Sequence, residues 1–204
     1  KDLAKKFGYN HRTFECWHNQ NAIPLKEYSN LTEMAGLDLN DDLKLKAKTL
    51  LKPCRLPKLN PKLFRFIALV IADGHLTKNY VEFSNSDKNL LNEFLELSKE
   101  LFGLNGKIKY PKNRVTKSII GSSVLAKILN KIFEIPYGNK AKRVVVPDIL
   151  FKQDNECVSE FISGIVDCEG YIGREYIEVS SVSKDLSKSL CTLFLRLGIL
   201  PRFV

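Results

Sequence analysis

Apolar and polar residues alternate along this chain of 204 residues with two periods, and the order of those periods predicts a mixed α+β fold. A nearly continuous apolar stretch from Lys62 to Ala72 predicts a buried helix. Residues 80–84 alternate apolar and polar side chains, as a half-buried strand does. An amphipathic helix is then predicted over Lys88–Phe102. The pattern continues with two basic strands and a helix, at Lys107–Tyr110, Arg114–Ile120 and Val124–Phe133.

The same order of elements recurs 96 residues later, which indicates a tandem duplication. The segment YVEFSNSDKNL begins at Tyr80, and its counterpart YIEVSSVSKDL begins at Tyr176. The second copy again predicts an apolar helix, Ser159–Cys168, a short hairpin, and an amphipathic helix, Asp185–Leu197. Its sequence stops about where a second hairpin would begin, so the second repeat is predicted to be truncated.

The N-terminal segment reads as short helices joined by a glycine turn. A helix over Asp2–Phe7 is expected to end at Gly8, and a second helix over His11–Asn19 is expected to follow, with a third after Pro24. This stretch resembles the repressor-type helix-turn-helix modules of prokaryotic regulators, and His11 and Arg12 are its candidate DNA contacts. A purely structural helical bundle is the alternative.

These patterns divide the chain into five expected parts. A helix-turn-helix-like module spans residues 1–45, and a basic, proline-containing linker spans 46–60. The first repeat spans 61–136, a linker between the repeats spans 137–154, and the incomplete second repeat spans 155–204.

Charge and composition favour a nucleic-acid partner. The net charge is +9, and a cationic surface attracts polyanions through phosphate neutralisation and counterion release. The apolar runs are too short to span a bilayer, so no membrane partner is expected. Five dispersed cysteines lack the grouping of a zinc site or a disulfide framework, which favours a cytoplasmic protein. High Lys, Glu and Ile content with two Gln residues favours a thermophilic, archaeal source.

Two acidic residues end the two apolar helices of the repeats and are the candidate catalytic residues. Asp73 and Glu169 are 96 residues apart, and each is followed by a glycine. Close helix packing needs small side chains, and we expect glycines after the acids to allow a sharp turn into the hairpin. The expected helix-interface residues are Ala68, Ala72, Gly164 and Cys168, and the turn glycines are Gly74 and Gly170. Two adjacent carboxylates repel each other unless protonated or bridged by cations, and Mg²⁺ prefers such oxygen ligands.

The nine residues Phe66–Gly74 and Ile162–Gly170 resemble the two signature motifs of the LAGLIDADG family of homing endonucleases. This resemblance implies tandem αββαββα repeats related by a pseudo-twofold axis in a monomer. It also implies hydrolysis of double-stranded DNA at a long, pseudo-palindromic site. One acid from each repeat, Asp73 or Glu169, would bind Mg²⁺ or Mn²⁺ for the cleavage of one strand.

DNA contacts are expected from the strands and hairpin turns, whose side chains reach phosphates and base edges. The expected contacts are Lys78, Tyr80, Glu82, Lys107, Lys109, Lys112, Arg114, Lys117, Arg174 and Tyr176. Many family members carry a basic residue just after each first hairpin, where this chain has Ser86 and Val182. Lys88 and Lys184, two residues later, are the candidates for that role.

The sequence therefore predicts a metal-dependent, sequence-specific DNA endonuclease, either intein-derived or free-standing. A DNA-binding regulator that no longer cleaves is one alternative, favoured by the helix-turn-helix and the shifted lysines. An RNA-splicing maturase is the other.

Overall fold

The computed structural model describes residues 8–19, 23–24, 44–45 and 53–203 of the chain. The chain forms two compact units, Lys1–Leu45 and Lys46–Val204. No helix among the described residues has both the length and the apolar character needed to cross a membrane.

The first unit contains helix α2 (His11–Asn19), as expected, and ends at strand β1 (Lys44–Leu45). The side chain of Asn10 accepts a hydrogen bond from the Arg12 amide at 2.9 Å, and Gly8 has a φ of 72°. The rings of Phe14 and Trp17 lie 5.5 Å apart. The other two helices of the expected helix-turn-helix lie outside the described residues, so that module stays a prediction.

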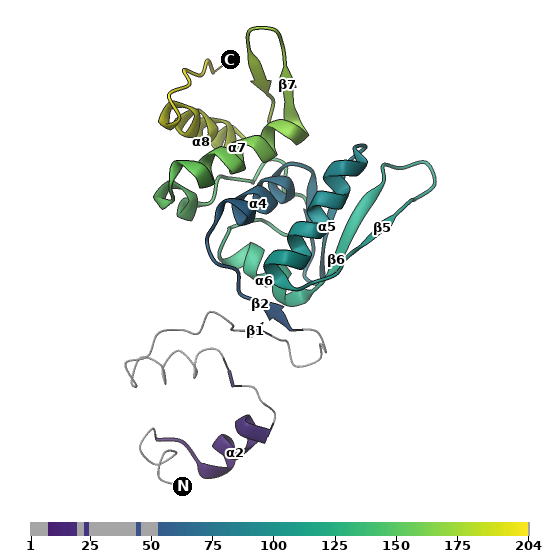
Figure 1. The fold of residues 1–204 in the computed structure, drawn as a ribbon, viewed down its shortest axis with the longest axis vertical. Helices are drawn as coiled ribbons and strands as arrows, with labels where there is room; N and C mark the ends of the chain where they lie inside the picture. The colour runs from purple at the N-terminus through teal and green to yellow at the C-terminus, as the bar shows by residue number, and fades with distance from the viewer. Residues whose placement is uncertain (1–7, 20–22, 25–43, 46–52, 204) are drawn as a thin grey trace. The chain divides into compact units, whose positions relative to one another are not determined.

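The second unit contains both repeats, and its elements from β2 onward are drawn in Figure 1. It begins with β2 (Cys54–Arg55), where the sequence predicts a linker over residues 46–60; Cys54 is fully buried and β2 packs against α5. The first repeat comprises α4 (Pro61–Asp73), β3 (Gly74–Leu76), β4 (Tyr80–Ser84), α5 (Lys88–Phe102), β5 (Lys107–Lys109), β6 (Lys117–Gly121) and α6 (Ser123–Lys131). A 3₁₀ helix (Asp148–Lys152) precedes the second repeat, which comprises α7 (Asn155–Glu169), β7 (Gly170–Ile172), β8 (Ile177–Val179) and α8 (Lys184–Arg196).

Capping side chains fix where these helices begin. The side chain of Asn60 accepts from the Leu63 amide at 2.9 Å, and Pro61 occupies the first helical position of α4. The carboxylate of Asp154 accepts from the Cys157 amide at 2.8 Å. This cap starts α7 at Asn155, four residues before the start that apolar periodicity predicts.

The first repeat forms a four-stranded antiparallel sheet in the order β3-β4-β6-β5. Its inner face buries Val81, Phe83 and Ile120, and β4 contacts α4, α5 and α6. Phe83 stacks on Phe94 of α5 with ring centroids 5.1 Å apart. The opposite face of the sheet carries Tyr80 and other half-buried or exposed polar side chains, and it is therefore available to a ligand.

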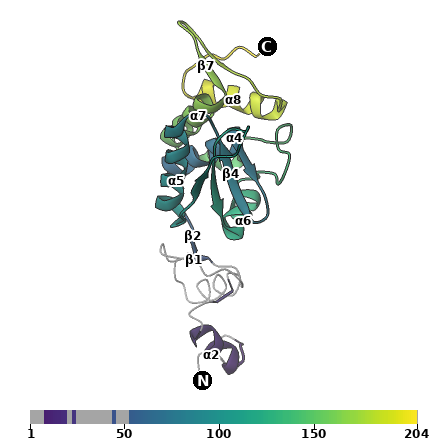
Figure 2. The ribbon, with the colours of Figure 1, turned by 90° about the vertical axis from the view of Figure 1, so that its right-hand side faces the viewer.

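Helices α4 and α7 form the most extensive contact between two elements of the described chain. They lie side by side in both views of the ribbon (Figures 1 and 2). A Cβ atom added at Gly164 of α7 would lie 2.6 Å from the Cβ of Ala68 of α4. Small residues thus let the two helices approach closely, as the sequence predicts.

We expect Gly164→Ala to lower the free energy of unfolding by about 1–2 kcal/mol, because the added methyl group must force α4 and α7 apart. This value already includes the gain of about 1 kcal/mol that alanine has over glycine in a helix. The matched control is Gly121→Ala, where an added Cβ meets nothing within 4 Å. Urea unfolding of both variants measures the difference, and equal stabilities would contradict the close-packing account.

Candidate active site at the ends of two paired helices

Asp73 and Glu169 are the last residues of α4 and α7, and the pairing of these helices brings their carboxylates together. Burial raises the pKa of Asp73 above its ordinary value. Burial also raises the pKa of Glu169, and the negative charge of Asp73 raises it further. The two acids therefore interact electrostatically across the helix pair.

The glycines after the two acids are needed for a different reason from the one the sequence suggests. Gly74 and Gly170 have φ angles of −84° and −95°, which any residue adopts, so no unusual turn conformation is present. A Cβ at Gly74 would instead lie 2.4 Å from the carbonyl oxygen of Val70, and one at Gly170 would lie 2.4 Å from that of Val166. Glycine is required because each strand starts against the last turn of its helix.

The carboxylate of Asp73 is oriented by Asn85, at the end of β4. The side-chain amide of Asn85 donates to Oδ2 of Asp73 at 2.8 Å, and its Oδ1 accepts from the backbone amide of Asp87 at 2.8 Å. The amide group of Asn85 is thus held at both ends. Ser181 stands 96 residues later in the second repeat, so the two acids have different neighbours.

A buried lysine lies beside both acids. Lys140 donates hydrogen bonds through Nζ to the carbonyl oxygens of Ile71 and, at 2.7 Å, of Ala72, near the end of α4. Burial lowers the pKa of Lys140 to about 8, although the charges of Glu169 and Asp73 raise it. The positively charged side chain beside the two acids therefore belongs to the segment between the repeats.

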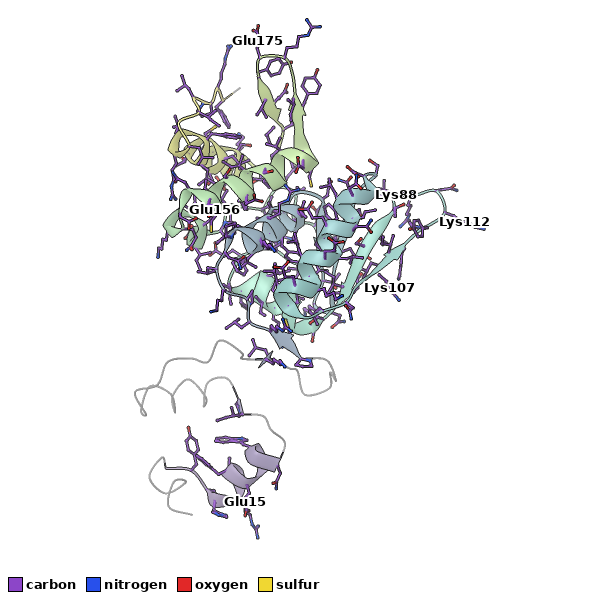
Figure 3. The ribbon with its side chains drawn as sticks, viewed as in Figure 1. Glu15, Lys88, Lys107, Lys112, Glu156 and Glu175 are labelled. Carbon is purple, nitrogen blue, oxygen red and sulfur yellow. The ribbon has the colours of Figure 1, made fainter. Side chains whose placement is uncertain are left out.

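The structure places Lys140 beside both acids, where sequence reasoning offered Lys88 and Lys184 as the basic residues of the site. Lys140 is the lysine whose charge lowers the pKa values of Asp73 and Glu169, whereas Lys88 is exposed at the start of α5, labelled in Figure 3. Sequence reasoning gave this residue no role in the site, because no periodic pattern separates one lysine in a loop from the chain's many others.

Arg65 is a second residue to which no sequence pattern pointed. Its side chain is 10% exposed and joins α4 to both neighbouring helices. Nε and Nη2 donate to the carboxylate of Glu93 in α5 at 2.7 and 3.0 Å. Nη1 lies 2.6 Å from Oδ2 of Asp167 in α7 and donates to the Ser163 hydroxyl at 3.2 Å. This network fixes the position of α7 at Asp167, which lies two residues before Glu169.

Cys168 contributes a small side chain at the helix interface, next to Asp73. Burial raises the pKa of Cys168 to about 12, with a further contribution from the charge of Asp73. The residue therefore remains a neutral thiol near pH 7. Ala72, the corresponding residue of α4, is half-buried at the same end of the helix pair.

The expected DNA contacts fall on three surfaces of the described chain. Glu82 and Lys117 lie on the outer face of the four-stranded sheet and form an ion pair of 2.9 Å, which partly neutralises that lysine. Lys107 and Lys112 lie along the β5–β6 pair and at its connecting turn (Figure 3). Exposed or half-buried residues of the same surface are Tyr80, Lys109 and Arg114, with Lys78 exposed at the first hairpin turn. Arg174 and Tyr176 are exposed on the β7–β8 hairpin, and His11 and Arg12 lie on α2 of the first unit.

The donor set at the helix ends fits a divalent cation that also takes ligands from its substrate. The described residues contain no group of three or more His, Cys, Asp or Glu side chains that could enclose a metal ion. Two carboxylates with raised pKa values instead leave negative charge for a cation to neutralise. Mg²⁺ commonly binds through one or two carboxylates together with water and phosphate oxygens.

We expect Lys140→Met to raise the pKa values of Asp73 and Glu169 further, because Lys140 lowers both. In the metal-free protein, two carbonyl acceptors left unpaired should cost about 1–3 kcal/mol of stability, and removal of a lysine whose lowered pKa makes its protonated form unfavourable at pH 7 should offset this cost. A carboxyl group with a raised pKa costs stability once it ionises, so the part of the stability change that comes from the two acids should disappear below their ordinary pKa values of 3.8 and 4.5.

Carboxyl-detected NMR titration and urea unfolding as a function of pH measure both effects. Lys142→Met, at an exposed lysine two residues away, is the control. Unchanged carboxyl pKa values in Lys140→Met would show that its ammonium group does not act on the two acids.

The fold resembles that of a solved homing endonuclease. Two structures of I-DmoI, one of mesophilic variants and one in complex with DNA and Mn, each align with a TM-score of 0.53 and 15% sequence identity. The alignments cover 69% and 70% of this chain, and 78% and 81% of those chains.

Sequence relatives are parts of longer proteins with unrelated names. An A-type ATP synthase subunit of Pyrococcus abyssi is 34% identical over 152 residues, which make up 72% of this chain and 15% of that protein. Glutamine–fructose-6-phosphate aminotransferase of Methanocaldococcus jannaschii is 32% identical over 156 residues, 74% of this chain and 14% of that protein. Replication factor C small subunit of the same organism is 30% identical over 147 residues, 70% of this chain and 8% of that protein. The chain thus spans less than a sixth of each of these relatives.

Both repeats match a known protein family. Residues 60–132 and 156–204, more than half of the chain, match the LAGLIDADG-like domain. These ranges contain the duplicated helices that end in Asp73 and Glu169, and the chain therefore belongs to the LAGLIDADG family.

Proposed function

We propose that this chain is an endonuclease that hydrolyses phosphodiesters of double-stranded DNA at a specific sequence, with Mg²⁺ or Mn²⁺ as its cofactor. The observation that carries this proposal is the meeting of Asp73 and Glu169 at the ends of the paired helices, beside Lys140. DNA binding alone does not require two adjacent carboxylates that repel each other.

Asp73 and Glu169 would hold the divalent cations, each acid serving the cleavage of one strand. When bound, the cations supply an activated water molecule and stabilise the leaving oxygen. Asn85 orients the carboxylate of Asp73 through its hydrogen bond of 2.8 Å, as outer hydrogen bonds commonly orient metal-binding side chains.

Lys140 would place positive charge near the scissile phosphate. Its Nζ is held by two carbonyl groups at the end of α4, so its position is fixed before substrate binds. A pKa of about 8 allows this amine both to carry a proton and to release one near neutral pH, which suits a general acid at the leaving oxygen.

The outer face of the four-stranded sheet would bind the DNA. Lys107, Lys109, Lys112 and Arg114 supply positive charge for phosphates, and Glu82 is oriented by its pairing with Lys117. The pseudo-symmetry of the repeats supports a long, pseudo-palindromic target, because protein symmetry mirrors site symmetry. In the first unit, His11 and Arg12 would add contacts if the N-terminal segment is a helix-turn-helix.

The relatives support an origin within an inserted element. A similar segment, 30–34% identical to this chain, recurs in proteins with unrelated names and spans at most 15% of each of those compared above. This distribution is expected of a mobile endonuclease segment in unrelated hosts, as in inteins.

We expect Mg²⁺- or Mn²⁺-dependent cleavage of a randomised duplex library, with sequencing of the cut ends to identify the site. Asp73→Asn and Glu169→Gln should each lower the rate of double-strand cleavage by at least about 100-fold, because each removes a carboxylate that holds a cation. Nicking of the one remaining strand is the expected residual activity. The matched control is Glu160→Gln, an exposed carboxylate in the same helix as Glu169.

Tight duplex binding without cleavage by the unmodified chain, unchanged in both variants, would support the regulator instead. Cleavage that both variants retain would remove these acids from the active site.

We expect a Lys107→Gln, Lys109→Gln variant to bind duplex DNA more weakly at low salt. Each lost phosphate contact should reduce the slope of log affinity against log salt concentration by about 0.9. The control carries Lys131→Gln and Lys152→Gln, two exposed lysines outside the sheet. Fluorescence anisotropy across a salt series measures both slopes, and equal slopes in the two variants would place the DNA elsewhere.

A further inference from the structure

The loop between the repeats, residues 137–147, is attached to both of them. On the side of the first repeat, the backbone amide of Gly138 donates to the carbonyl oxygen of Leu76 in β3 at 2.9 Å. On the side of the second repeat, the hydroxyl group of Ser183 donates to the carbonyl oxygen of Val144 at 2.7 Å. Val144 is 3% exposed and Ser183 is 2% exposed, so this second attachment is buried. The inter-repeat loop therefore bridges the two repeats beside the candidate active site.

Hydrogen bonds within the inter-repeat loop connect its two attachments. The backbone amides of Arg143 and Val144 donate to the carbonyl oxygen of Lys140 at 2.7 and 2.9 Å. The side chain of Arg143 folds back and donates to the carbonyl oxygens of Asn139 and Tyr137, each at 3.0 Å. A displacement of Val144 is therefore passed on to the backbone of Lys140.

Ser183 has two roles, of which helix capping is only one. Its hydroxyl oxygen accepts from the Leu186 amide at 3.3 Å as the N-cap of α8, and the same hydroxyl group donates to Val144. A hydroxyl group can do both, because it has one proton to donate and two lone pairs. Asp87, 96 residues earlier, caps α5 by accepting from the Asn89 amide at 2.7 Å, and an ionised carboxylate cannot donate. The first repeat thus shows that a cap at this position needs no hydroxyl proton.

We propose that Ser183 is a positioning residue for Lys140, which it holds in place through Val144 and the inter-repeat loop. The ammonium group of Lys140 donates to the carbonyl oxygens of Ile71 and, at 2.7 Å, of Ala72. Both acceptors belong to the first repeat, whereas the loop that presents the ammonium group is anchored in the second repeat by Ser183. The position of this cationic group therefore depends on both repeats at once.

The consequence for catalysis rests on the proposed function, because Lys140 acts there near the scissile phosphate. Loss of the Ser183 hydroxyl group would leave the carbonyl group of Val144 without its buried donor. The inter-repeat loop would then be attached through the first repeat alone, and the Lys140 side chain would leave the end of α4 more often. The placement of Lys140 can be measured without any DNA cleavage.

The test compares the chemical reactivity of two lysines in the inter-repeat loop. Acetylation with acetic anhydride, mapped by tandem mass spectrometry, measures Lys140, which is 9% exposed, against the exposed Lys142. In Ser183→Ala we expect the ratio of Lys140 to Lys142 labelling to rise about threefold or more, because loss of one hydrogen bond shifts local opening by this order. Ser183→Thr, which keeps a hydroxyl group, should restore the low ratio. The control is Ser122→Ala, since Ser122 is also buried and caps α6 by accepting from the Leu125 amide at 3.1 Å.

A rise in the labelling ratio in Ser183→Ala, absent from Ser122→Ala and reversed by threonine, supports the proposal. An unchanged ratio in Ser183→Ala overturns it, and an equal rise in Ser122→Ala does so too, because a lost helix cap alone would then explain the result.

Single-turnover cleavage at saturating DNA gives a separate readout of the catalytic consequence. Ser183→Ala should cleave about tenfold more slowly at unchanged DNA affinity, because a displaced catalytic group lowers the rate of the chemical step. A raised labelling ratio with an unchanged cleavage rate would overturn the catalytic part. Absence of cleavage by the unmodified chain would contradict the proposed function, and the labelling ratio would still decide whether Ser183 places Lys140.

Discussion

The close approach of α4 and α7 is the contact on which the rest of the second unit depends. Gly164 lies so near Ala68 that no Cβ fits between the helices. Because both acids are the last residues of their helices, the separation of the helix axes decides whether the carboxylates interact. Packing geometry and site electrostatics are therefore set by the same few small residues.

This arrangement is electrostatically unfavourable by itself. Two partly buried carboxylates lie at helix C-termini, where the helix dipole already disfavours negative charge. Lys140 offsets part of this cost by binding carbonyl groups of α4 and by lying near both acids. The pKa values of both acids remain raised, so the site still has a net preference for positive charge.

The two repeats share a backbone plan but not their surroundings. Asn85 orients Asp73, whereas Ser181 occupies the corresponding position near Glu169. Arg65 pairs with Asp167 across the helix interface, but the residues 96 positions away from these two are Phe161 and Ile71. These differences make the pairing of α4 with α7 asymmetric, and an ion pair that has one correct partner helps to fix that pairing.

The sequence by itself determined the duplication, the α+β order of elements, the small residues of the helix pair and the two acids that end its helices. These features have local periods or a fixed offset, which a linear reading detects. The tertiary structure alone decided the roles of Lys140, Asn85 and Arg65, and the reason why Gly74 must lack a Cβ. Each of these roles depends on a contact that no repeating pattern in the sequence marks. The contacts of Lys140 and Arg65 reach partners 28 to 98 residues away along the chain. Such contacts arise only when packing brings particular side-chain atoms within reach.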